Sequence, residues 1–174
     1  EIFRGTPMIV QSMVIFYGSA QAFNISLDRT CAAIFIVSIN TGAYMSEIVR
    51  GGILAVDPGQ FEAATALGMT HGQTMRKVVL PQVVRNILPA TGNEFVINIK
   101  DTSVLNVISV VELYFTGNTV ATQNYQYFPT FTIIAVIYFV LTFTITRILR
   151  YIERRLDSDT YTTGANQMQV KEVK

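Results

Sequence analysis

Long stretches without charge dominate the pattern of this chain. No charged residue occurs in residues 5–27, 30–46 or 113–146. A helix needs about 20 mostly apolar residues to cross a bilayer. The apolar residues are densest in residues 8–23, 32–39 and 128–146. Each of the three charge-free stretches therefore predicts a membrane-spanning helix around its densest part.

A fourth span is predicted over residues 84–107, although Glu94, Lys100 and Asp101 weaken its apolar character. The alternative is a helix buried within a soluble protein. The distribution of basic residues favours a span, because Lys and Arg concentrate in cytoplasmic loops. Four spans with both ends inside place every basic cluster in the cytoplasm, whereas three would put the arginines after residue 146 opposite Arg4.

Composition agrees with a membrane protein. Charged residues make up 14% of the chain, against roughly 25% in a typical soluble domain. Residues 157–174 are polar and mixed in sign, and we expect a mobile cytoplasmic tail there. The chain begins at Glu1 without an initiator Met or a signal-peptide pattern, so we interpret it as a fragment.

Residues 57–82 contain the signals of two short helices joined at a glycine. Asp57 suits a helix cap, and Pro58 suits the first turn of a helix. Gln60 stands where its side chain can reach back to the backbone of the cap residue. Gly68 suits the end of this helix. We expect a second helix over residues 70–79 that stops before Pro81.

These residues carry a resemblance to a known family. The cytoplasmic loop of binding-protein-dependent ABC importer permeases has the pattern Glu-Ala-Ala, three residues, Gly, nine residues, Ile-x-Leu-Pro. The chain has Glu62-Ala63-Ala64, Gly68 and Val78-Val79-Leu80-Pro81, with Val78 as the one departure. Three further segments resemble the polar amino acid branch: residues 4–11, 43–53 and 99–105.

The resemblance implies an all-α transmembrane fold, the type I ABC importer permease bundle. The family core has five spans, so the first is expected upstream of Glu1. The permease domain would cover residues 1–156 of a multi-pass protein in the bacterial plasma membrane, with the loop 57–82 and the C-terminus in the cytoplasm. The residues expected to couple this loop to an ATPase are Glu62, Ala63, Ala64, Gly68, Leu80 and Pro81. For Glu62 the alternative is a solvated charge that complements the helix dipole.

The chain has no Gly-x-x-x-x-Gly-Lys-Ser/Thr phosphate loop, so ATP must bind to another polypeptide. We therefore expect no catalytic residue and no cofactor on this chain, with ATP and Mg on a partner. The resemblance implies ABC ATPase subunits, a second permease subunit (the same or homologous) and an extracytoplasmic solute-binding protein. Membrane lipid and the transported amino acid complete the expected partners, and nucleic acid is not among them.

A polar stripe on the fourth predicted span is the candidate substrate path. Glu94, Asn98 and Asp101 share a helix face by their spacing, and Thr102 lies beside them. Such a stripe is costly in a membrane unless it faces protein or water. It would bind the zwitterionic head group or a polar side chain. The alternative is hydrogen bonding that holds helices together.

The branch resemblance implies a polar amino acid as substrate, with glutamine or glutamate foremost. A basic amino acid is the alternative, since Glu94 could pair with it. A competing function is an ion-coupled secondary transporter or channel that uses Glu94, Lys100 and Asp101. A third interpretation is an intramembrane enzyme, and the lack of the motifs of such enzymes argues against it. His71, the single histidine, has no second ligand nearby, so no metal site is expected.

Overall fold

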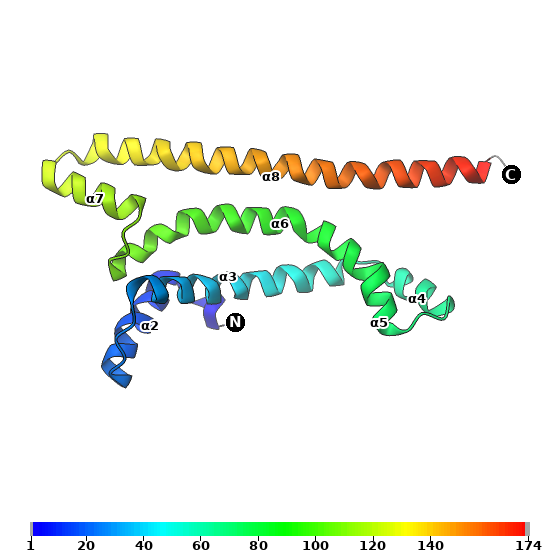
Figure 1. Cartoon of the computed structure of the whole chain (residues 1–174), viewed down its shortest axis with the longest axis horizontal. Helices are drawn as coiled ribbons and strands as arrows, with labels where there is room; N and C mark the ends of the chain where they lie inside the picture. Colours follow the sequence, from blue (N-terminus) through cyan, green and yellow to red (C-terminus); the bar gives the residue numbers. More distant parts are fainter. Residues whose placement is uncertain (1, 173–174) are drawn as a thin grey trace. The chain divides into compact units, whose positions relative to one another are not determined.

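A computed structural model describes residues 2–172, with side chains described for residues 3–156, and these residues form helices and no strand (Figure 1). The all-α expectation is therefore confirmed. The elements are α1 (Ile2–Gly5), α2 (Met8–Phe23), α3 (Arg29–Leu54), α4 (Pro58–Ala66), α5 (His71–Thr74), the π-helix η1 (Met75–Val79), α6 (Leu80–Asp101), the 3₁₀-helix η2 (Thr102–Ile108), α7 (Leu113–Asn124) and α8 (Tyr127–Glu172).

The chain divides into two compact units, which are described separately. The first unit comprises Glu1–Ser46 and Asn93–Thr144, and the second comprises Glu47–Gly92 and Ile145–Lys174. The helices α3, α6 and α8 each contribute residues to both units.

Two of the described helices are long and apolar enough to cross a membrane. They are α3, with a mean hydropathy of 1.4, and α8 over Tyr127–Leu156, with 2.1. A bent pair, His71–Ile108 and Leu113–Asn124, would count as a third span with a break of 54°. The helix α2 has only 16 residues, or roughly 24 Å against a hydrocarbon core of about 30 Å. By length and composition, the four expected spans become two, or three with the bent pair.

The helix α8 continues past the predicted permease domain. A mobile tail was expected over residues 157–174, yet α8 remains helical through Glu172. The segment contains no proline, so the helical hydrogen bonds need not stop at Leu156. Residues 173–174 lie outside the described part, and the cytoplasmic position of the segment stays a prediction.

The start of α3 is fixed by an aspartate. The Asp28 carboxylate accepts from the backbone N–H of Thr30 at 2.9 Å and of Cys31 at 3.0 Å. Donated hydrogen bonds favour the ionised form, and the bond from Cys31 is the main reason that the pKa of Asp28 is lowered. Asp28 therefore gives α3 a charged cap that complements its dipole.

The core of the first unit forms where η2 meets α2 and α3. Ile36 and Ile108 are fully buried, together with Leu105, Ala32 and Ala33. Close packing of these side chains holds the elements together, as it does between helices in a membrane. Tyr17 donates to the carbonyl of Val107 at 3.3 Å. This core places the end of α6 next to α2 and α3, which matters for the site below.

The helix α7 is capped by Glu112 and packs closely on α8. The Glu112 carboxylate accepts from the N–H of Phe115 at 2.6 Å and of Tyr114 at 2.8 Å. It also accepts from the Tyr138 hydroxyl at 3.1 Å. Gly117 is buried, and a Cβ there would collide with the Ile134 side chain. The close packing of α7 on α8 therefore requires a residue without a side chain at position 117.

Gly117→Val should destabilise the folded protein, because overpacking a close contact costs about 1–3 kcal/mol. We expect a lower melting temperature of the detergent-purified protein. Gly42→Val is the control, since nothing lies within 4 Å of a Cβ at Gly42. An unchanged melting temperature for Gly117→Val would mean that Ile134 gives way without cost.

Candidate functional site

The first candidate site is the helical hairpin formed by α4, α5 and η1, which lie side by side in the second unit (Figure 1). The expected start of α4 is confirmed: the Asp57 side chain accepts from the N–H of Gly59 at 2.7 Å, and Pro58 occupies the first turn. The predicted reach of Gln60 back to the cap is replaced by another contact. Its side-chain oxygen accepts from the Gln82 amide at 3.5 Å.

Gly68 makes the expected bend. Its φ is +75°, a left-handed conformation that residues with a Cβ adopt at a cost. The Gly68 N–H donates to the Thr65 carbonyl at 2.9 Å, and the Met69 N–H donates to the Ala64 carbonyl at 3.1 Å. This pair of bonds is the Schellman arrangement that closes helices at a glycine.

The second hairpin helix begins as expected but does not end there. Thr70 and Gln73 form a reciprocal capping box, with bonds of 2.9 and 3.4 Å. The predicted stop before Pro81 is wrong, because η1 leads directly into α6. The Leu80 N–H donates to the Met75 carbonyl, five residues back. This wider turn accommodates Pro81, which has no N–H to donate, within a continuous helix.

The six predicted coupling residues divide into two groups by exposure. Glu62, Ala63, Gly68, Leu80 and Pro81 are exposed, whereas Ala64 is only 3% exposed. Ala64 therefore belongs to the interior of the hairpin. Beside the hairpin, Val56, Val79 and Val83 form a small core with partly buried neighbours. The exposed residues thus lie on a segment whose conformation is stabilised by its own small core.

Sequence reasoning missed Leu67. This side chain is 82% exposed and directly precedes Gly68. An apolar residue at the end of a helix, immediately before a terminating glycine, was a signal that could have indicated an exposed tip.

The second candidate site is a polar pocket within the first unit. It has a volume of about 430 Å³ and is lined by residues 4–8 and by Asn40, Tyr44, Glu94, Ile97 and Asp101. Three segments meet there: the N-terminal segment, α3 and α6. The volume falls in the roughly 300–1,000 Å³ range of small-molecule sites.

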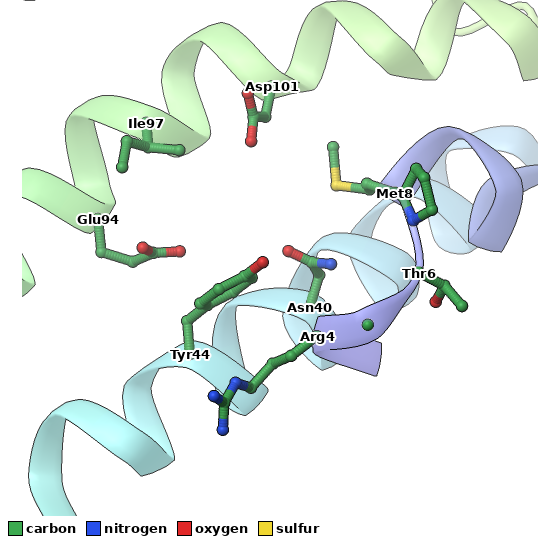
Figure 2. A pocket seen from close by; sticks show the side chains of 10 residues that line it. Arg4, Thr6, Met8, Asn40, Tyr44, Glu94, Ile97 and Asp101 are labelled. Atoms are coloured by element: carbon green, nitrogen blue, oxygen red, sulfur yellow. The ribbon is translucent and has the colours of Figure 1, made fainter. Parts of the chain in front are cut away.

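The electrostatics of the pocket are dominated by two carboxylates. Figure 2 shows Glu94 and Asp101 pointing from α6 towards the space that Tyr44 and Asn40 enter from α3. Glu94 is buried and Asp101 half-buried. Arg4 contributes the only basic side chain in the lining. Formally the lining carries one net negative charge, which suits a ligand with an ammonium group.

The predicted polar stripe divides between the pocket and the packing of helices. Glu94 and Asp101 line the pocket, while Asn98 and Thr102 do not. Asn98 accepts from the Thr41 hydroxyl at 3.0 Å, which joins α6 to α3. The Thr102 hydroxyl donates to the carbonyl of Ile99 at 2.8 Å, within its own chain segment. Helical spacing alone did not separate these roles.

The side chains of Arg4, Asn40 and Tyr44 line the pocket but were not among the candidate site residues predicted from the sequence. Arg4 entered the argument as a positive charge and as the start of the family-like segment 4–11, and Asn40 and Tyr44 lie on another helix. The signal for Tyr44 was its place in the segment 43–53, which resembles the polar amino acid branch. Among the described residues no group of three potential metal ligands comes together.

Comparison with known proteins gives a consistent result. Residues 1–158 match the family model described as binding-protein-dependent transport system inner membrane component. The glutamine transport system permease protein GlnP of Escherichia coli (strain K12) is 41% identical over 157 residues, which cover 90% of this chain and 72% of that protein. The arginine transport system permease protein ArtQ of Bacillus subtilis (strain 168) is 37% identical over 159 residues, covering 91% and 73%.

Two solved structures have a similar fold. A crystal structure of an amino acid ABC transporter with histidines superposes with a TM-score of 0.83 at 44% identity, covering 88% of this chain and 72% of that one. An inward-facing structure of the MetNI methionine ABC transporter gives a TM-score of 0.75 over 89% of this chain and 71% of that one. At 21% identity, the second likeness concerns the fold alone.

Proposed function

Because the chain belongs to the family of binding-protein-dependent transport system inner membrane components, we propose that it is the permease subunit of an ATP-driven amino acid importer. The observation that carries the proposal is the 41% identity with a glutamine permease over 157 residues. The resemblance to the polar amino acid branch is confirmed, and the all-helical fold is that of the type I ABC importer permeases.

The chain is a multi-pass membrane protein, and we propose its orientation from its basic residues. We place the hairpin and the C-terminal end of α8 in the cytoplasm. Arg76, Lys77 and Arg85 lie in or just after the hairpin, and Arg150 and Arg154 follow the apolar part of α8. Basic residues favour the cytoplasmic side of a membrane.

The hairpin would transmit the work of a separate ATPase that binds ATP and Mg. Glu62 in the middle of α4 and Leu67 just past its end are both exposed, so one could pair with a basic side chain and the other could enter an apolar groove. Ala64 is buried and would act by holding the hairpin together. The Schellman bonds and the capping box keep these positions ordered. A second permease and a solute-binding protein complete the proposed assembly.

The pocket would receive the amino acid during transport. An α-ammonium group is attracted by Glu94 and Asp101, and the α-carboxylate by Arg4. Glutamate would add a second carboxylate beside two of the same charge, which is unfavourable. We therefore propose glutamine ahead of glutamate. A basic amino acid is the second candidate, because the paired carboxylates could hold an additional positive charge.

Transport should require ATP hydrolysis. With the chain, its ATPase and its binding protein reconstituted in liposomes, we expect glutamine uptake that depends on ATP inside and stops with vanadate. Labelled arginine offered in parallel decides between the two substrate classes. Uptake driven by a proton or sodium gradient without ATP would instead establish the ion-coupled transporter and remove the proposal.

A further inference from the structure

Gln11 is a buried amide that lies outside the lining of the pocket. Its side chain is 7% exposed and belongs to α2. The side-chain nitrogen donates to the Phe3 carbonyl at 2.6 Å, to the Thr6 carbonyl at 2.8 Å and to the Thr6 hydroxyl at 3.0 Å. One amide thus binds the N-terminal segment at three points.

The same side chain also reaches α3. The Gln11 oxygen accepts from the side-chain amide of Asn40 at 3.3 Å, and Asn40 is itself a buried lining residue. Gln11 therefore connects two of the three segments that form the pocket. The third segment, the end of α6, reaches α3 through the bond between Asn98 and Thr41.

The hydrogen bonds from Gln11 are a specific contact between α2 and the N-terminal segment. Residues 3–7 are exposed, so burial of apolar side chains contributes little there. Hydrogen bonds to a buried partner are strong in comparison, because an unmade bond leaves buried polar groups without a partner.

We propose that Gln11 is a positioning residue of the pocket, holding residues 4–8 against α3 so that the amino acid meets a preformed site. The inference rests on the proposed function only in taking the pocket as the amino acid site. A preformed site binds more tightly, since less ordering is required when the ligand arrives. A change at Gln11 that loosens residues 4–8 should therefore weaken binding of the amino acid, although Gln11 itself does not contact it.

The informative variant is Gln11→Glu. Glutamate has nearly the same size, but an ionised carboxylate cannot donate to the carbonyls of Phe3 and Thr6. The carboxylate repels these two carbonyls, while the hydrogen bond that the Asn40 amide donates to the side chain at position 11 can remain. Gln11→Met removes the amide without adding charge and guards against a folding defect of the charged variant. Ser12→Ala is the matched control, because buried Ser12 donates only within its own helix, to Met8 at 2.8 Å.

Two measurements on the assembled transporter test the inference. Binding of labelled L-glutamine and L-arginine reports the site, and hydrogen exchange by mass spectrometry reports the segment. For both Gln11 variants we expect about 10-fold weaker binding of the amino acid that the wild type binds. We also expect faster exchange in residues 3–8, with unchanged exchange in residues 57–82. Ser12→Ala should resemble the wild type in both.

The outcomes separate this inference from the proposed function. Unchanged binding in the Gln11 variants, with binding lost in Glu94→Gln, would overturn the inference alone. Weaker binding without faster exchange in residues 3–8 would also overturn it, because Gln11 would then act by another route. If Glu94→Gln binds both amino acids normally, the pocket is not the amino acid site. The proposed function of the pocket then fails, while the exchange data still decide whether Gln11 holds the segment.

Discussion

Glu94→Gln should reduce amino acid uptake by about 10- to 100-fold in the reconstituted transporter. The buried carboxylate of Glu94 faces the pocket together with Asp101. A charge-assisted hydrogen bond is worth roughly 1.5–3 kcal/mol, and each 1.4 kcal/mol is about tenfold in affinity. Glutamine keeps the size and one acceptor but removes the charge that attracts an ammonium group. Initial rates of labelled uptake at fixed ATP are the measurement.

Asn98→Ala is the control for this prediction. Asn98 lies one turn along α6 but outside the lining, where it accepts from Thr41. Its removal should lower the thermal stability of the protein and leave substrate binding nearly unchanged. The sequence pattern alone placed both Glu94 and Asn98 on the candidate substrate path. Wild-type uptake by Glu94→Gln, with the complex present in normal amount, would exclude Glu94 as the ammonium site.

Gly68→Val should uncouple the transporter. Valine at φ +75° is strained, because a left-handed conformation costs an L-residue about 1–2 kcal/mol and a β-branched one more. The strain falls on the turn whose bonds involve Thr65 and Ala64, so the hairpin should lose its shape. We expect uptake to fall about tenfold or more, because a strain of about 1.4 kcal/mol or more lowers the population of the ordered hairpin by about that factor. ATP hydrolysis should respond less to the binding protein.

Gly72→Val provides the comparison. Gly72 lies four residues further, in α5, has no positive φ, and has open space around a Cβ. This variant should retain at least half of the uptake. Equal losses in the two variants would argue that any bulk in the hairpin is harmful, and that the bend at Gly68 is not the cause. The ratio of transport to ATP hydrolysis distinguishes lost coupling from lost assembly.

The hairpin was largely predictable because its signals are local. Asp57, Pro58 and Gly68 each act on backbone within a few residues, and each acts as expected. The end of the second helix was not predictable by the same logic. A proline ordinarily ends a helix, but a wider turn over Met75–Val79 removes the conflict at Pro81. Nothing in the composition of that segment distinguishes a π-helix from an α-helix.

The pocket was predictable only on one of its sides. Helical spacing placed Glu94, Asn98 and Asp101 on one face. Spacing does not determine which neighbouring group each side chain contacts. Asn98 meets Thr41, while Glu94 and Asp101 meet the pocket. The contributions of Tyr44 and Arg4 depend on contacts across the fold. Gln11 was visible in the sequence only as part of a family-like segment, since two of its four hydrogen-bond partners are backbone carbonyls, which any residue carries.

The π-helix η1 has a consequence for how chain length constrains this protein. A π-turn holds one residue more than an α-turn, so deleting a single residue from Met75–Val79 would leave an uninterrupted α-helix. The segments on either side would keep about the same orientation, because the deletion removes only the extra residue of one turn. The conflict that the wider turn avoids at Pro81 would return, since an α-turn brings the proline ring against a carbonyl of the preceding turn. A one-residue gap here would therefore weaken the junction between the hairpin and α6, even where every motif residue is retained.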